Sequence, residues 1–219
     1  MACEVNTHKD DSLFASTPPL EALRLLLSWT ATEPPSGGLP TGGPSSGGRQ
    51  PRRSRRKVLL IDVRKAHLHA VSVREVYVQM PPELRAKYPG MCWKLKRCLY
   101  GTRDAPAQWE ALYIAKLQEM GFTVGSASAN CLYNPKLNVQ CVVHGDDFTF
   151  SGSDQSLDLV EAQMKKAFLC KVEGRLGGEP HDLKQARILN RVITWNDWGI
   201  QYEADPRHAE VLVRELKVS

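Results

Sequence analysis

Three aspartates are the residues whose types and spacing point most directly to chemistry. Asp62 ends an apolar run that is typical of a buried β-strand. Asp146 and Asp147 stand side by side in a short, glycine-containing turn between apolar runs at 139–143 and 148–150. Two such runs around a short polar turn predict a β-hairpin with the adjacent aspartates at its tip.

Adjacent carboxylates in a tight turn repel each other, and a bound divalent cation relieves that repulsion. Carboxylate oxygens are hard ligands that suit Mg²⁺, which proteins usually hold with one or two carboxylates plus water and phosphate. Two such ions activate an attacking hydroxyl and stabilise the leaving oxygen in phosphoryl transfer. The spacing alone leaves an alternative open, in which Asp146 and Asp147 occupy a solvated turn and Asp62 is an ordinary loop residue.

The elements that must position these carboxylates alternate between strand and helix patterns. Strands are expected at 58–61, 75–80, 93–99, 139–143, 148–150, 188–195 and 199–202. Helices are expected from Asp104 to Gly121, from Ser153 or Asp154 to Phe168, and from Pro206 to about Lys217. This order favours an α+β fold, an antiparallel sheet with helices on one face.

Two segments precede that part of the chain. Residues 1–32 are expected to form a lead-in and a helix, with Thr17 as N-cap and Pro18 as the first helical residue. Residues 33–57 are rich in Gly, Pro and Ser and end in a run of Arg, so they cannot bury a core, and we expect a flexible linker. The folded domain is therefore predicted at 58–219.

The charge of the chain is concentrated in the linker. The whole sequence carries a net charge of +5, and residues 33–57 carry six cations against Glu33 alone, so the rest of the chain is balanced. The simplest interpretation of this basic run is a solvated connector. The alternatives are an arm that contacts phosphates or a nuclear-import signal.

Other sequence features narrow the class of protein. No apolar run approaches the roughly 18 residues that a membrane-crossing helix needs, and the first residues lack the apolar stretch of a secretory signal. The six cysteines form no C-x-x-C pair, and free thiols in a reducing compartment are expected. The chain is thus predicted to be intracellular, in the cytoplasm or nucleus, without a membrane.

Several ordered segments resemble the reverse transcriptases of copia-type retrotransposons, which are parts of retrovirus-related Pol polyproteins. Residues 61–69 (Ile-Asp-Val-Arg-Lys-Ala-His-Leu-His) resemble the first carboxylate motif of that family. Residues 98–109 (Cys-Leu-Tyr-Gly-Thr-Arg-Asp-Ala-Pro-Ala-Gln-Trp) are similar to its Leu-Tyr-Gly…Ala-Pro…Gln-Trp segment, and residues 143–147 (Val-His-Gly-Asp-Asp) stand at its Tyr-Val-Asp-Asp. Shorter matches also occur in order, at 75–77 (Glu-Val-Tyr), 81–82 (Pro-Pro) and 131–133 (Cys-Leu-Tyr).

The resemblance covers about 58–219 and implies a polymerase palm, an RNA-directed DNA polymerase that extends a primer on an RNA or DNA template with dNTPs. It implies that Asp62, Asp146 and Asp147 are catalytic and hold Mg²⁺ or Mn²⁺. The residues that it places near the incoming nucleotide and template are Val63, His67, Gly101, Arg103, Ala105 and Pro106. Residues 17–29 are similar to the helix that leads into the first motif in the family.

The sequence departs from the family at several positions. His67 and His144 replace an aromatic residue and a tyrosine, which reduces the steric basis for sugar discrimination at His67, and Asp104 adds a negative charge near the nucleotide. No upstream segment matches the family's triphosphate-gripping fingers, so we expect weak or absent activity from this chain alone. An inert remnant that binds nucleic acid or a partner is the alternative, while the ordered motifs argue against an unrelated phosphohydrolase.

Overall fold

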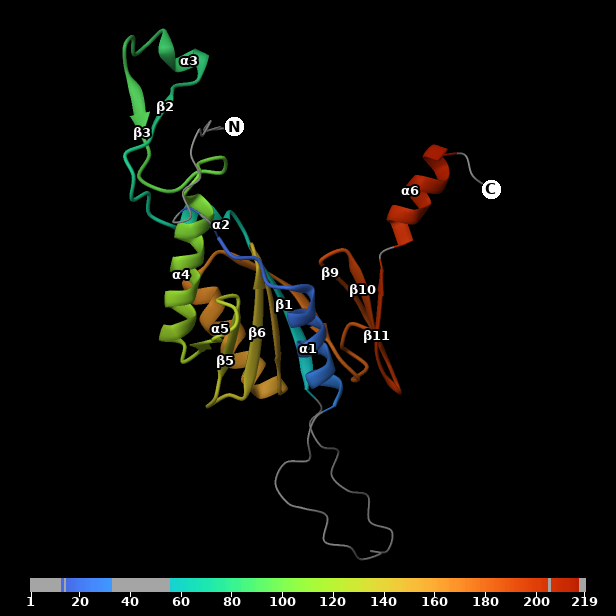
Figure 1. Cartoon of the computed structure of the whole chain (residues 1–219). Helices are drawn as coiled ribbons and strands as arrows, with labels where there is room; N and C mark the ends of the chain where they lie inside the picture. Colours follow the sequence, from blue (N-terminus) through green and yellow to red (C-terminus); the bar gives the residue numbers. More distant parts are fainter. Residues whose placement is uncertain (1–12, 14, 33–55, 205, 217–219) are drawn as a thin grey trace, which may run out of the picture.

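The computed structural model describes residues 13, 15–32, 56–204 and 206–216, so most of the linker expected at 33–57 lies outside the described residues. Its central feature is a six-stranded sheet in which every neighbouring pair is antiparallel (Figure 1). In spatial order the strands are β4 (Thr123–Val124), β5 (Cys131–Asn134), β6 (Val139–His144), β7 (Asp147–Gly152), β1 (Lys57–Val63) and β8 (Cys170–Leu176).

Strand β1 is apolar on both sides because both faces of the sheet are covered. Side chains alternate between the two faces along a strand, and Leu59, Ile61 and Val63 pack into one core while Val58 and Leu60 pack into another. A continuous apolar run is the pattern of a strand buried on both faces. This placement puts Asp62 near the end of a strand fixed in the interior of the sheet.

One face of the sheet carries the helices α4 (Ala105–Glu119) and α5 (Asp154–Ala167) (Figure 1). Trp109, Tyr113 and Leu117 of α4 pack there with the inward residues of β1, β6 and β7 and with α5. The predicted α+β fold, an antiparallel sheet with helices on one face, is confirmed, with α4 and α5 as the helices of that face. The predicted hairpin of β6 and β7 is present as well.

The opposite face is covered by α1 (Leu20–Ala31) and by a separate three-stranded sheet (Figure 1). The strands of that sheet are β9 (Gln185–Ile188), β10 (Arg191–Asn196) and β11 (Gly199–Ala204). The helix expected near residue 17 is therefore α1, and it covers the face of the main sheet opposite to α4 and α5. Its sequence pattern predicted the helix but not this position. It begins at Leu20 after Pro19, so the expected N-cap role of Thr17 is wrong.

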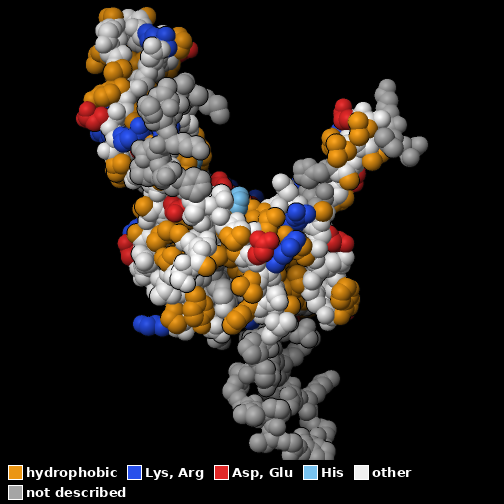
Figure 2. Space-filling view, viewed as in Figure 1, with side chains coloured by type: hydrophobic (Ala, Val, Ile, Leu, Met, Phe, Trp, Pro, Cys, Tyr) orange, Lys and Arg blue, Asp and Glu red, His pale blue; other side chains and the backbone are white. Residues whose placement is uncertain are grey.

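An arm between β1 and α4 projects from one end of the sheet (Figure 1). It begins after the short helix α2 (Ala66–His69) and carries β2 (Tyr77–Gln79), α3 (Pro82–Arg85) and β3 (Cys92–Lys94). The helix α6 (Pro206–Leu216) stands on the other side of the same end. Figure 2 shows the surface hollowed between the arm and α6.

The boundary between linker and domain lies two residues earlier than the sequence indicated. Arg56 and Lys57 are both 3% exposed, and Lys57 is the first residue of β1. Nη2 of Arg56 donates to the carbonyl oxygens of Asn138 at 2.8 Å and of Ser151 at 2.7 Å. The last two cations of the basic run are therefore anchors of the fold and not part of a solvated connector.

Among the described residues, no helix has both the length and the apolar composition to cross a membrane. The cysteines within the described residues, five in number, are free thiols, as predicted.

Candidate metal centre

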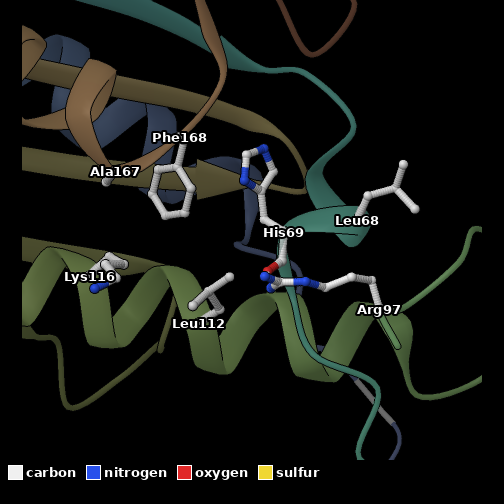
Figure 3. Close-up of a pocket in the computed structure, with 7 residues that line it drawn as sticks. All are labelled: Leu68, His69, Arg97, Leu112, Lys116, Ala167 and Phe168. Carbon is white, nitrogen blue, oxygen red and sulfur yellow. The ribbon is translucent and has the colours of Figure 1, made fainter. Parts of the chain in front are cut away.

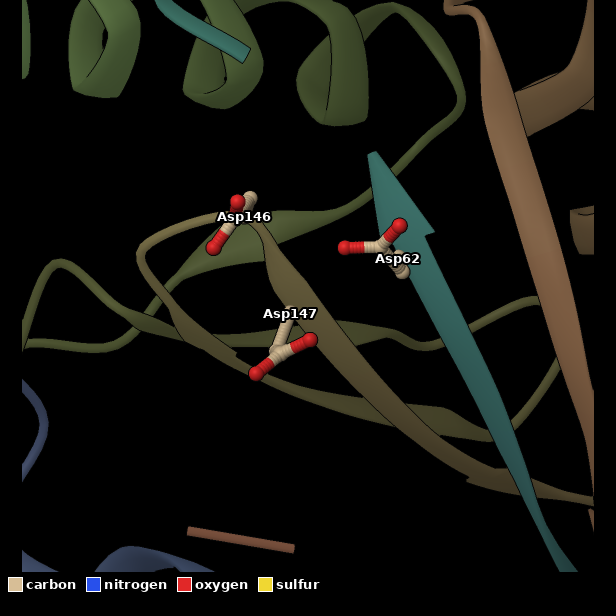
Figure 4. Close-up of side chains that lie close together, drawn as sticks. All are labelled: Asp62, Asp146 and Asp147. Carbon is tan, nitrogen blue, oxygen red and sulfur yellow. The ribbon is translucent and has the colours of Figure 1, made fainter. Parts of the chain in front are cut away.

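The carboxylates of Asp62, Asp146 and Asp147 converge at the end of β1 and the β6–β7 turn (Figure 4), the end of the sheet from which the arm projects (Figure 1). Asp62 on β1 is the direct cross-strand partner of Asp147 on β7, and Asp146 precedes it in the β6–β7 turn. One carboxylate oxygen from each residue lies within 4.8 Å of the others. The structure therefore brings together the three residues that the sequence singled out.

Two hydrogen bonds hold the turn that carries Asp146. The backbone N–H of Val63 donates to the carbonyl oxygen of Asp146 at 2.9 Å. Nε1 of Trp109, a residue only 2% exposed, donates to the carbonyl oxygen of Gly145 at 2.8 Å. Gly145 has φ of +65°, a conformation that glycine adopts without steric cost. The turn is thus fixed from β1 on one side and from α4 on the other.

The electrostatics of the cluster favour a bound cation. Partial burial, with the added charges of Asp146 and Glu173, raises the pKa of Asp62 above its ordinary value. Burial, followed by the charges of Asp146 and Asp62, likewise raises the pKa of Asp147. Like charges held together are less costly when a divalent cation lies among them. The donor set, three carboxylates with access to solvent, fits Mg²⁺ or Mn²⁺.

Two charged residues beside the cluster were not identified from the sequence. Lys171 on β8 is the cross-strand neighbour of Asp62, and its Nζ lies 2.7 Å from a carboxylate oxygen of Glu173. Lys171 lowers and Glu173 raises the pKa of Asp62. They were missed because no strand was predicted at 170–176, where the structure has β8, and a β-bulge at Leu60 and Ile61 interrupts its pairing with β1.

His67 lies on α2 next to the aspartates, and its ring packs on that of Tyr100 with centroids 4.4 Å apart and planes tilted by 31°. Burial lowers the pKa of His67, against the opposing influence of Asp146. Within the described part of the chain, Nδ1 of His67 is buried without a hydrogen-bond partner. His67 and Tyr100 therefore form a tilted ring pair near Asp146.

Of the remaining predicted nucleotide residues, Val63 lies at the end of β1, and the other four lie at or just before the start of α4 and differ in exposure. Gly101 is exposed with φ of +95°, and Arg103 and Pro106 are partly exposed. Ala105 is fully buried and packs with Ala70 and Cys98, so its side chain serves the contact between α4 and the chain after α2. Val63 is buried too, and only its backbone faces the aspartates.

Asp104 does not add free negative charge to this surface, contrary to the expectation from its sequence position. Its side chain is 2% exposed, and Oδ1 accepts a hydrogen bond from Nη2 of Arg74 at 2.8 Å. The hydrogen bond from Arg74 holds the pKa of Asp104 below its ordinary value, although burial alone raises it. Asp104 thus ties the base of the arm to α4.

His144, the other departure from the family pattern, is the last residue of β6 and the cross-strand partner of Asp147. It is partly buried, and its charge lowers the pKa of Asp147. Its place opposite Asp147 therefore puts His144 beside the three aspartates.

Comparison with known proteins places this geometry in context. The family model described as "Reverse transcriptase (RNA-dependent DNA polymerase)" matches residues 52–178, more than half of the chain and the part that holds all three aspartates. The retrovirus-related Pol polyprotein from transposon RE1 of Arabidopsis thaliana is 32% identical over 100 residues, 44% of this chain and 7% of the relative. The corresponding polyprotein from transposon RE2 is 28% identical over 100 residues, with the same shares covered. The matched segment is therefore a small part of the relatives' length.

Proposed function

The chain belongs to the reverse transcriptase family, and on that premise we propose that it is the palm region of a copia-type retrotransposon polymerase. The reaction is transfer of a nucleotide from a dNTP to a primer. The primer 3′-hydroxyl loses its proton to water and its oxygen forms a bond to the α-phosphorus, while the bond from that phosphorus to the bridging oxygen breaks and pyrophosphate leaves. The observation that carries the proposal is the convergence of Asp62, Asp146 and Asp147 from two paired strands.

Asp62, Asp146 and Asp147 would hold Mg²⁺ or Mn²⁺ in this reaction. Such a cation supplies a Lewis acid at the attacking hydroxyl and at the phosphate oxygens. The protein's contribution is position: the Val63 N–H and the Trp109 indole fix the turn, so the carboxylates need little rearrangement before the reaction. Charge neutralisation and alignment of the two reactants then account for most of the rate enhancement.

The incoming nucleotide is assigned to the surface between α2 and the start of α4. His67 with Tyr100 forms one wall beside the aspartates, and Gly101, Arg103 and Pro106 form the adjoining surface. The imidazole of His67 is smaller than the aromatic residue that the family pattern has there. We therefore expect ribonucleotides to be discriminated less strongly than a larger ring would allow.

The RNA or DNA template-primer is assigned to the hollow between the arm and α6 (Figure 2). Large exposed apolar side chains on the arm include Tyr77, Met91 and Trp93, with exposed fractions of 54%, 62% and 44%. Nζ of Lys94 lies 5.8 Å from the centroid of the Tyr77 ring, so cationic and aromatic groups are interleaved there. Such surfaces stack bases and contact phosphates without demanding a particular sequence.

The arm also favours the second candidate function, an inert remnant that binds nucleic acid. Its aromatic and basic groups are independent of the three aspartates, and binding there requires no catalysis. The substitution Asp146→Asn distinguishes the two candidates. In the first candidate it abolishes the metal-dependent reaction, whereas in the second there is no reaction to lose. Nucleic-acid binding is unchanged in both.

Single-nucleotide addition to a labelled primer, with Mg²⁺ and dNTPs and the full chain, tests the proposal. We expect slow addition that is lost in Asp146→Asn and retained in Asp197→Asn, a control at an exposed turn position. Addition that survives in Asp146→Asn contradicts the assignment of the aspartates. No addition at all, together with retained binding of a single-stranded oligonucleotide, favours the inert remnant.

A further inference from the structure

A cavity of about 350 Å³ lies next to α2, between α4 and the C-terminal end of α5 (Figure 3). It is lined by four apolar and three basic residues, and no acidic residue lines it: Leu68, Leu112, Ala167 and Phe168, with His69, Arg97 and Lys116. Its size is near the lower end of the roughly 300–1,000 Å³ typical of small-molecule sites. None of the residues assigned to the polymerase reaction lines it, so it is a separate feature.

The apolar wall of the cavity is rigid. Phe168 is 5% exposed and lies at the C-terminal end of α5. Its ring meets that of His69 edge to face, with centroids 5.5 Å apart and planes at 89°, and it also packs against Trp109 at 5.2 Å. Figure 3 shows the His69 ring directed toward Phe168. A fixed aromatic wall suits a flat or branched apolar group that would otherwise face water.

The basic side chains of Arg97 and Lys116 lie at the rim of the cavity, where nearby carboxylates do little to neutralise their charge. Nη1 of Arg97 donates to the carbonyl oxygen of His69 at 2.5 Å, which fixes the guanidinium, and Arg97 forms no ion pair with a carboxylate of the described residues. Lys116 pairs with Glu119 at 2.8 Å, but Glu119 is 64% exposed and lies outside the lining. Exposed pairs of this kind contribute little and separate readily.

We propose that this cavity binds a small organic anion with an aromatic or branched apolar body and one carboxylate. The body packs on Phe168 and Leu112, and the carboxylate accepts hydrogen bonds from Arg97, with Lys116 adding charge. A planar guanidinium matches both oxygens of a carboxylate, and such charge-assisted bonds are stronger than neutral ones. A bare phosphate ion meets the same cations but leaves the apolar wall without a partner, so it binds less well.

Calorimetric titration of the full chain with 2-naphthoate, without added metal, tests the proposal. The neutral 2-naphthamide probes the charge, and inorganic phosphate probes the apolar body. We expect 2-naphthoate to bind about tenfold more tightly than either, which corresponds to about 1.4 kcal/mol. Arg97→Gln is expected to weaken 2-naphthoate about tenfold, and the control Arg214→Gln, on an arginine whose side chain is 74% exposed on α6, is expected to leave it unchanged.

Arg97 is exposed, so Arg97→Gln is expected to fold, which thermal melting verifies. Asp146→Asn should bind 2-naphthoate like the unaltered chain, which separates failure of this proposal from failure of the polymerase assignment. The proposal is overturned by absence of 2-naphthoate binding at millimolar concentration. Equal affinity for 2-naphthamide or phosphate, or equal loss in Arg97→Gln and Arg214→Gln, overturns it as well.

Discussion

Replacement of Lys57 by methionine removes the cation that bridges Asp154 and Asp182 at the start of β1. Nζ of Lys57 lies 2.6 Å from an oxygen of Asp154 and 2.9 Å from one of Asp182, and the lysine side chain is 4% exposed. Burial by itself lowers the pKa of Lys57, but the hydrogen bonds to Asp154 and Asp182 outweigh it and raise that pKa. The lysine is therefore charged in the folded protein.

The cost of Lys57→Met arises mainly at Asp182. The Asp154 side chain is 44% exposed, so water solvates it after the change, whereas that of Asp182 is 1% exposed. The second oxygen of Asp182 keeps a hydrogen bond from the N–H of Glu179 at 2.8 Å. Removing one partner of a buried pair costs about 3–5 kcal/mol, and the retained bond places the expected loss near the lower value, ~3 kcal/mol.

Urea unfolding followed by circular dichroism measures this loss. With a slope of about 1–3 kcal/mol per molar urea, the midpoint should fall by roughly 1–3 M. Lys136→Met, at an exposed lysine, is the matched control and should change stability by less than about 0.5 kcal/mol. Adding Asp182→Leu to Lys57→Met should recover much of the loss, because the unpaired charge is gone. Equal midpoints for Lys57→Met and the control would refute the view that Lys57 is an anchor.

Three further changes have defined outcomes. Lys65 has φ of +56°, so Lys65→Asn should stabilise the fold by about 0.5–1 kcal/mol in thermal melting; a lower melting temperature would contradict this. Because Arg74 lowers the pKa of Asp104, that carboxylate contributes stability above its unfolded pKa of about 3.9 and loses it as the pH falls through the lower folded value. Arg74→Gln should cost about 2 kcal/mol at neutral pH and flatten the acid limb of the stability profile; an unchanged limb is the opposing result. In Gly177→Ala the new Cβ lies 2.5 Å from an oxygen of Asp182, so the free energy of unfolding measured in urea should fall by about 1–3 kcal/mol. An unshifted urea curve would argue against that contact.

The elements that carry the three aspartates were predictable because their determinants are local, whereas the pairing of Asp62 with Asp147 joins residues 85 apart in the sequence. Asp62 follows a run of apolar residues, and the β6–β7 hairpin pairs residues that are close in sequence. Ser153, expected to begin a helix, is the N-cap of α5 and accepts a hydrogen bond from the N–H of Ser156. Gly121, expected to end a helix, has φ of +90° just after α4.

The rest depended on partners distant in sequence. Arg56 and Lys57 look like the end of a basic run, and their burial is set by Ser151 and Asp182, which lie 95 and 125 residues away. Composition alone carries no information about such partners. Similarly, the core that α1 shares with β9, β10 and β11 forms between elements that lie far apart in the sequence.

The predicted strands at the arm were too long for a related reason. The expected strand at 75–80 is reduced to Tyr77–Gln79, and that at 93–99 is replaced by Cys92–Lys94. The two pair only with each other and project from the main sheet, so no further strand extends them (Figure 1). Alternating residues in an exposed hairpin have no core that would favour a longer ladder.

Binding of a divalent cation to the three aspartates is the central claim, and calorimetric titration of the full chain with Mg²⁺ and with Mn²⁺ tests it most directly. The geometry predicts binding by the unaltered chain and by Asp197→Asn, and its loss in Asp62→Asn and in Asp146→Asn. Circular dichroism should show that all four proteins are folded. Absence of binding by the unaltered chain, or equal binding by the Asp62 and Asp146 variants, would contradict the claim.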